Sequence, residues 1–217
     1  MDDLLLPIFP LEIVLFPEEP LPLHIFEERY KLMISECLAA KAAGSARQEF
    51  GIVCATAQGV QPVGCAARVV NVTRKYEDGR MDIFAVGTRR FEILYTNEEK
   101  AYLRGGVAFF DDDPSCDVAS DEEAQPAIEL FRRAIQRLRK SDEVPVHLTR
   151  PYRYLSFRIA GGLPLDLEFK QQLLGIRNES ERIKLVSRIV EKLIIKLEVV
   201  EKTRAKAGGN GNARSHT

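Results

Sequence analysis

The sequence lacks the short motifs that identify several large classes of enzyme and metalloprotein. It contains no G-x-x-x-x-G-K-[ST] phosphate-binding loop, no G-x-S-x-G nucleophile turn and no HExxH zinc helix. Its four cysteines form no CxxC pair, and its three histidines, His24, His147 and His216, lie far apart. We therefore expect no metal, no cofactor and no disulfide, and we interpret the cysteines as reduced, mostly buried thiols.

The sequence also lacks the features of a membrane or secreted protein. No run of about eighteen apolar residues occurs, so no membrane span is expected. The first residues, "MDDLLLPIFP", begin with acidic side chains instead of the basic region of a signal peptide. These observations predict a cytoplasmic protein without a membrane partner.

Charge is present in quantity but is unevenly distributed. The 217 residues are 45% hydrophobic and carry a net charge of −1. Residues 1–125 hold 12 basic against 22 acidic residues, whereas residues 126–217 hold 19 against 10. This asymmetry suggests two parts with different surfaces, and it leaves a polyanionic partner conceivable for the second part.

The first part has the patterns of short strands and one helix. Five prolines punctuate apolar segments in residues 6–30, and they predict short strands over 8–9, 11–16 and 21–26 with a turn at Pro17–Pro20. Apolar residues then recur at helical spacing from Tyr30 to Leu38. From Phe50 the period returns to two, with a tight hairpin expected at Glu77–Arg80 and a bulge or corner at Gly87. Residues 1–115 are therefore predicted to form a β-rich domain with one helix.

The second part is predicted to be helical. An acidic connection over residues 116–126 leads to helical periodicity over 127–205, which we interpret as a small bundle. Its longest helix opens near Asn178, and residues 206–217 are expected to form a flexible tail. The apolar seam of that helix comprises Ile183, Val186, Val190, Leu193, Leu197 and Val200. This seam would permit self-association if it were exposed, but burial within the chain is simpler.

Several of these segments together resemble a known family. They are "LPIFPLEIVLFPEEPLPLHIFEERY", "FGIV", "VGCAARVVNV", "DGRMDIFAVGTRRFEI" and "YLRGGV", followed by "SFRIAGGLPLDLEFKQQLL". They resemble the N-terminal, substrate-binding domain of Lon proteases and the stand-alone Lon-domain proteins of bacteria, over roughly residues 4–204. One departure is Glu28, where family members often carry proline. The resemblance implies an α+β fold in which a PUA-like β-barrel, or folded sheet, precedes a helical bundle.

The resemblance also implies a function in recognition without catalysis. Lon proteases join this region to an ATPase and a serine–lysine peptidase, and the sequence has no motif for either. We expect binding of unfolded or exposed polypeptide, as an adaptor in protein quality control, through exposed apolar side chains in a groove between the two parts or through an unpaired sheet edge. A monomer or weak dimer is compatible with this function.

Six residues are candidates either for the recognition surface or for a structural motif. They are His24, Phe26, Arg29, Tyr30, Arg90 and Phe91. For Arg90 and Phe91 we favour the structural interpretation, in which the aromatic ring is core and an arginine hydrogen-bonds backbone carbonyls. No catalytic, cofactor-binding or metal-binding residue is predicted.

Two alternative functions stay open at this point. RNA binding is suggested by the PUA-like barrel and by a basic helical surface (Arg132, Arg133, Arg137, Arg139 and Lys140), but the acidic balance of the β-rich part makes it the weaker hypothesis. That basic surface could equally face acidic residues of its own chain. A hydrolase would need a polar pocket with perturbed pKa values, and no motif supports one.

Overall fold

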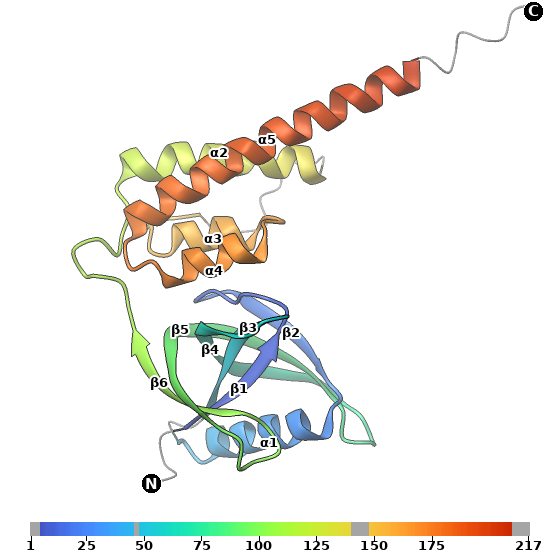
Figure 1. Cartoon of the computed structure of the whole chain (residues 1–217), viewed down its shortest axis with the longest axis vertical. Coiled ribbons are helices and arrows are strands. Elements are labelled where there is room, and N and C mark those ends of the chain that lie inside the picture. The colour runs from blue at the N-terminus through green and yellow to red at the C-terminus, as the bar shows by residue number, and fades with distance from the viewer. Residues whose placement is uncertain (1–4, 46–47, 140–147, 210–217) are drawn as a thin grey trace, which may run out of the picture. The chain divides into compact units, whose positions relative to one another are not determined.

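The computed structural model describes residues 5–45, 48–139 and 148–209, and Figure 1 traces the chain from end to end. Residues 206–209 continue the last helix, while residues 210–217 of the predicted tail lie outside the described residues. Lys140, His147 and His216 also lie outside them.

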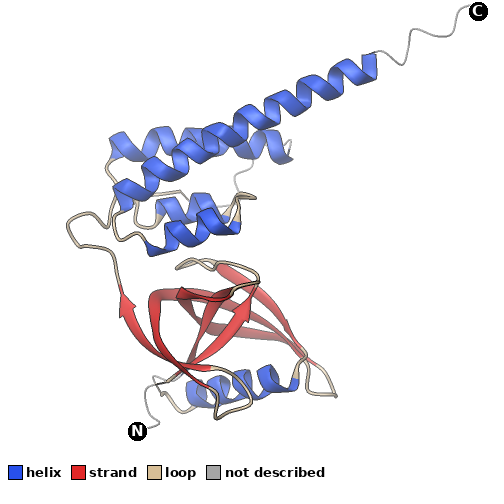
Figure 2. Ribbon diagram, in the orientation of Figure 1, coloured by secondary structure: helices blue, strands red, loops and turns tan. Residues whose placement is uncertain are grey.

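The chain divides into two compact units. The first comprises residues 1–113 and 164–177, and the second comprises residues 114–163 and 178–217. All six described strands belong to the first unit, and three of the five described helices belong to the second (Figure 2). The α+β class is confirmed. However, the helix α4 (Leu167–Gly175) groups with the strands, whereas the sequence had placed it in the bundle of residues 127–205.

The strands of the first unit close into a barrel. They are β1 (Leu6–Leu11), β2 (Pro20–Ile25), β3 (Glu49–Thr56), β4 (Gly59–Lys75), β5 (Met81–Asn97) and β6 (Arg104–Phe110). Pairing runs β5–β4–β3–β1–β6 and returns to β5, so that these five strands form a ring. The first half of β5 also pairs with β2, which extends the sheet beyond the ring. Among these six described strands, only β1 and β3 pair in parallel.

The barrel core combines inward strand residues with one helix. The helix α1 (Glu28–Ala42) buries Tyr30, Met33, Ile34 and Cys37 in a cluster of core residues that includes strand residues such as Phe9 and Phe50. The ring of Tyr30 stacks on that of Phe9, with the ring centres 4.0 Å apart. The helix predicted from the spacing of Tyr30 to Leu38 is therefore present, and its apolar face is part of the barrel core.

The segment between β1 and β2 differs from the prediction. A strand was expected over residues 11–16, but only Leu11 of that range belongs to a strand. Val14, Leu15 and Phe16 are nevertheless buried, so the apolar residues enter the core from a loop. Apolar composition alone predicts burial, and it does not distinguish a strand from an ordered loop. The predicted turn at Pro17–Pro20 is present, with Glu18 at φ 63°.

Gly87 is the point where this turn lies against β5. The backbone N–H of Glu18 donates to the Gly87 carbonyl at 2.9 Å, and the Gly87 N–H donates to the Glu19 carbonyl at 3.0 Å. A Cβ atom on Gly87 would lie 2.1 Å from the carbonyl oxygen of Phe16. The predicted bulge is also here, because the pairing of β4 with β5 gains an extra β5 residue between Gly87 and Arg90. The hairpin predicted at Glu77–Arg80 connects β4 to β5, with Gly79 at φ 82°.

The second unit is built from α2 (Asp121–Arg139), α3 (Leu155–Gly161) and α5 (Glu179–Gly209). Ser120 and Glu123 form a capping box at the start of α2, with each side chain near the backbone N–H of the other. The helix therefore begins inside the segment predicted as an acidic connection. Along the predicted seam of α5, Ile183, Val186 and Val190 are buried, whereas Val200 is exposed.

We predict that Gly87→Ala lowers the free energy of unfolding by about 2 to 3 kcal/mol, because the added methyl group meets backbone that cannot move independently. Gly175→Ala is the matched control, since a Cβ there meets nothing within 4 Å. The control should leave stability unchanged or raise it by up to about 1 kcal/mol. Urea denaturation of the two variants measures the difference, and equal midpoints would contradict the close approach at Gly87.

Candidate functional site

The six candidate residues from the sequence fall into two groups in the structure. His24, Phe26 and Arg29 are exposed, and the Phe26 side chain is 60% exposed. Tyr30, Arg90 and Phe91 are buried, with exposed fractions of 6%, 1% and 0%. The exposed group lies on or beside one surface of the barrel, whereas Tyr30 and Phe91 pack in two separate clusters of core residues.

That surface is the outer side of β2 and the first half of β5. Along β5, Met81, Ile83 and Ala85 point into the core, so the residues between them face outward. Pro22 lies opposite Phe84, and His24 lies opposite Asp82. We call this surface the β2–β5 face, which comprises Pro20, Pro22, His24, Phe26, Tyr76, Asp82, Phe84 and Val86.

Sequence reasoning missed Phe84, which is 39% exposed at the centre of the β2–β5 face. A signal was available, because strict alternation places Phe84 on the same side as Asp82 and opposite to Ile83. A large aromatic residue on the polar side of an alternating strand is a candidate for a binding surface. Hydropathy alone assigns such a residue to the core.

Hydrogen bonds hold the aromatic rings at one end of this face. His24 Nδ1 lies 2.5 Å from Asp82 Oδ1, and the Tyr76 hydroxyl donates to Asp82 Oδ2 at 2.8 Å. The hydrogen bond with His24, followed by that from Tyr76, lowers the pKa of Asp82 below its ordinary value. The His24 ring stacks on the Phe26 ring and meets the Tyr76 ring edge-on, with ring centres 5.9 Å apart in both pairs. Asp82 therefore orients two rings beside the exposed Phe26.

The free edge of β2 is poorly suited to pairing with another strand. Among the described strands, β2 pairs only with β5. Two of its six residues, Pro20 and Pro22, have no backbone N–H, and proline on an edge strand discourages strand addition. The unpaired edge that the sequence analysis considered is therefore a weaker candidate for peptide binding than the side chains of the β2–β5 face.

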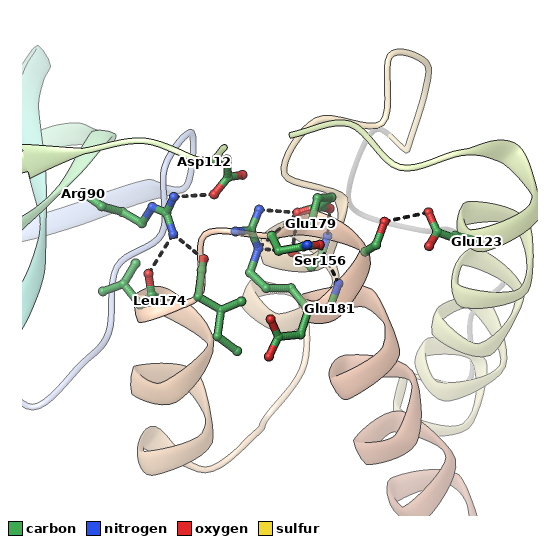
Figure 3. Close-up of polar contacts among 11 residues, drawn as sticks. Arg90, Asp112, Glu123, Ser156, Leu174, Glu179 and Glu181 are labelled. Atoms are coloured by element: carbon green, nitrogen blue, oxygen red, sulfur yellow. Dashed lines mark hydrogen bonds and ion pairs between the residues drawn. The ribbon is translucent and has the colours of Figure 1, made fainter. Parts of the chain in front are cut away.

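Arg90 attaches α4 to the barrel. Its guanidinium forms an ion pair with Asp112 and donates to the carbonyls of Leu174 at 3.0 Å and Ile176 at 2.6 Å (Figure 3). Those carbonyls lie at the end of α4, where a helix has acceptors without internal partners. Gln171 adds a hydrogen bond to the Val63 carbonyl at 2.9 Å. Arg90 therefore has the carbonyl-bonding role that the sequence favoured for an arginine here.

A serine near carboxylate and guanidinium groups occurs in the second unit. Ser156 Oγ donates to Glu179 Oε2 at 2.8 Å, and Arg182 Nε donates to Ser156 Oγ at 3.0 Å (Figure 3). All three residues have an exposed fraction of 0%. A nucleophile must reach its substrate, so this buried group joins α3 to α5 and offers no catalytic geometry.

The cysteines are poor candidates for chemistry. Cys37, Cys54 and Cys65 are buried, and Cys116 is partly exposed. Burial raises the pKa of the Cys37 thiol to about 12 and also raises that of Cys65, which keeps both protonated and unreactive. Within residues 5–45, 48–139 and 148–209, no three potential metal ligands come together. No helix in these ranges is both long and apolar enough to cross a membrane.

The basic helical surface is partly neutralised within its own unit. Arg137 forms ion pairs with Glu198 at 2.8 Å and Glu201 at 2.9 Å, both on α5. Arg132, Arg133 and Arg139 are exposed on α2. The acids near the start of α2 are also engaged, since Asp121 pairs with Arg150 and Asp117 pairs with Arg153.

Comparisons with known proteins agree on one family. A family model described as the ATP-dependent protease La (LON) substrate-binding domain matches residues 5–192. Lon protease 1 of Hydrogenovibrio crunogenus is 26% identical over 150 residues, which cover 66% of this chain and 18% of that protease. The chain thus matches a small part of the length of this curated relative.

Two solved structures show the same fold. A Lon N-terminal domain protein from Xanthomonas campestris aligns with a TM-score of 0.63 and 23% identity, covering 83% of this chain and 95% of its own. The N-terminal domain of a Mycobacterium avium complex Lon protease aligns with a TM-score of 0.64 and 18% identity, covering 86% and 98% respectively.

The Arg90 contacts generate a stability prediction. Arg90→Met leaves Asp112 buried with its ion-pair partner removed, and we expect a loss of about 3 to 5 kcal/mol in the free energy of unfolding. The double variant Arg90→Met/Asp112→Leu removes both charges and should recover part of that loss. Urea denaturation checks both, and a single variant as stable as wild type would contradict the attachment of α4 by Arg90.

Glu19 generates a pH prediction. Burial raises the pKa of its side chain above the ordinary 4.5, outweighing the hydrogen bond from the Phe16 N–H and the attraction of Lys170. The folded chain therefore binds this proton more tightly than the unfolded chain. The contribution of Glu19 to stability should be greatest below pH 4.5 and should fall as the pH rises through the folded-state pKa. Glu19→Gln should remove this decline, and parallel stability–pH curves for the variant and wild type would refute it.

Proposed function

The chain belongs to the family of the ATP-dependent protease La (LON) substrate-binding domain, and from this premise we propose that it is a non-catalytic module that binds exposed segments of polypeptide on its β2–β5 face. The observation that carries this proposal is the gathering of Phe26, Phe84 and two prolines on one solvent-facing surface. Contiguous exposed apolar side chains are typical of interaction sites.

The size of this apolar surface suits weak binding of ligands that differ in sequence. Full burial of one phenylalanine side chain contributes roughly 1.5 to 3 kcal/mol, and Phe26 and Phe84 are already partly covered by their neighbours. Two such contacts supply at most about 6 kcal/mol, and once the cost of ordering the ligand is subtracted they support an affinity of about millimolar. A module that must bind and release many different segments requires affinities of this kind.

Side chains, and not strand pairing, provide the recognition in this proposal. The two prolines of β2 remove N–H donors that an added strand would need. They also make the face both apolar and rigid, because a proline ring has little conformational entropy to lose on binding. The rings of His24 and Tyr76 are held by Asp82 before any ligand arrives, which lowers the entropic cost of binding further.

The absence of catalysis is part of the proposal. The family is described by substrate binding, and the serine that best resembles a nucleophile, Ser156, is buried beside Glu179 and Arg182. We propose an adaptor function in protein quality control, in which the chain delivers bound segments to another component. We expect it to act in the cytoplasm, where thiols such as Cys37 and Cys65 remain reduced.

We predict that the double variant Phe26→Ala/Phe84→Ala weakens binding of an unfolded probe by at least about tenfold, since it removes the apolar contacts of both rings. The probe is a short dye-labelled peptide with two phenylalanines in a glycine–serine sequence, and fluorescence anisotropy measures its binding. Phe109→Ala is the matched control, because Phe109 is 38% exposed, close to the 39% of Phe84, but lies on β6.

The control variant should bind the probe as wild type does. Equal losses of probe affinity in the Phe109 and Phe26/Phe84 variants would show nonspecific hydrophobic binding and overturn the β2–β5 face as the site. Absence of any binding by the wild-type chain would overturn the proposed function itself.

A further inference from the structure

Two arginines of β4 lie in register with the β2–β5 face. Across β4, β5 and β2, one row of paired residues is Arg74, Asp82 and His24. A second row is Arg68, Val86 and Pro20. Directly opposed residues in antiparallel strands project to the same side of a sheet. Arg68 and Arg74 are both exposed, and they flank the face at the rows of Val86 and Asp82. Phe84 lies between these two rows.

These two arginines differ from the others of residues 1–113. The remaining described arginines in that range form ion pairs with carboxylates: Arg29 with Glu27, Arg80 with Asp78, Arg89 with Glu49, Arg90 with Asp112 and Arg104 with Glu99. Within the described residues, Arg68 and Arg74 have no carboxylate at ion-pair distance. The unpaired guanidinium groups are thus the two that border the β2–β5 face.

Arg74 is also held in position. Its guanidinium lies over the Tyr76 ring, 4.6 Å from the ring centre. Asp82 lies opposite Arg74, whose positive charge helps to lower the pKa of its carboxyl group, but its two oxygens already accept hydrogen bonds from His24 and Tyr76. The charge of Arg74 is therefore oriented by an aromatic ring and available to a ligand.

We infer that the segments bound by this face are acidic as well as apolar, with a carboxylate on each side of a central aromatic residue. This inference rests on the proposed function and specifies its ligand. Asp82 and Val86, which mark the rows of the two arginines, are four residues apart on β5, a span of about 13 Å in an extended strand. An extended ligand matches that span when its two acids lie four residues apart with the aromatic residue midway, as in the pattern acid-x-aromatic-x-acid.

A polypeptide fits these charges better than a nucleic acid does. Two unpaired arginines neutralise two charges, which is too few for the strong electrostatic binding that nucleic acids require. Two separate carboxylates on a peptide, by contrast, each find one guanidinium.

The test compares peptides that differ only in charge. The probes are dye-labelled peptides with the core Glu-Ser-Phe-Ser-Glu, Gln-Ser-Phe-Ser-Gln or Lys-Ser-Phe-Ser-Lys in a common glycine–serine sequence. An exposed ion pair changes affinity by a few-fold, so at low salt the Glu peptide should bind about tenfold more tightly than the Gln peptide, and the Lys peptide should bind most weakly. High salt should make the affinities of the three peptides similar, because exposed charges are screened.

Variants assign the effect to the two arginines. Arg68→Gln and Arg74→Gln should each reduce the advantage of the Glu peptide about threefold, and the double variant should abolish it without weakening the Gln peptide. Arg89→Gln is the matched control, since Arg89 is exposed on β5 but pairs with Glu49, and it should leave the order unchanged. Thermal unfolding verifies that each variant remains folded.

The possible failures are distinguishable. Equal binding of the Glu and Gln peptides to the wild-type chain would overturn the acidic preference and leave the proposed function standing. No binding of any peptide would overturn both. A short single-stranded RNA that bound more tightly than every peptide, and that lost its binding in the double arginine variant, would show that the arginines serve a nucleic acid instead.

Discussion

The contact between the turn of residues 16–19 and Gly87 determines where β2 begins. Two backbone hydrogen bonds join the turn to Gly87, and the Phe16 carbonyl occupies the space of the missing side chain. The chain leaves this contact at Pro20, so that β2 pairs with the first half of β5 and leaves the second half to β6. The β2–β5 face exists because one long strand is shared between two neighbours in this way.

Polar and apolar groups have complementary tasks on that face. Asp82 is partly exposed, and its hydrogen bonds therefore add little to stability. Their value is geometric, because they hold His24 and Tyr76 beside Phe26, and Tyr76 in turn supports Arg74. An apolar surface with fixed rings loses less conformational entropy on binding than a surface of mobile side chains would.

The buried charges belong to structure and not to recognition. In the first unit Arg90 joins the end of α4 to Asp112 and the barrel, and in the second unit Arg182 and Glu179 join α5 to Ser156 of α3. A buried guanidinium can bond several acceptors at once, which makes it suited to connecting segments that are distant in sequence. Such residues look functional in a sequence because they are charged and lie among apolar neighbours.

Local patterns in the sequence predicted much of this protein by themselves. The prolines, the Asp78–Gly79 turn and the change of period at Phe50 predicted the strands and hairpin, and the spacing from Tyr30 to Leu38 predicted α1. These features depend on residues near one another in the chain. The tertiary structure alone decided that α4 groups with the barrel and that residues 14–16 enter the core without a strand.

The pairing of the arginines is likewise decided by the tertiary structure. Whether Arg68 or Arg74 has a carboxylate within reach depends on strands that come together from distant parts of the sequence, with a register set by bulges. Composition supplies the charges, and only the packing of the strands decides which of them remain unpaired.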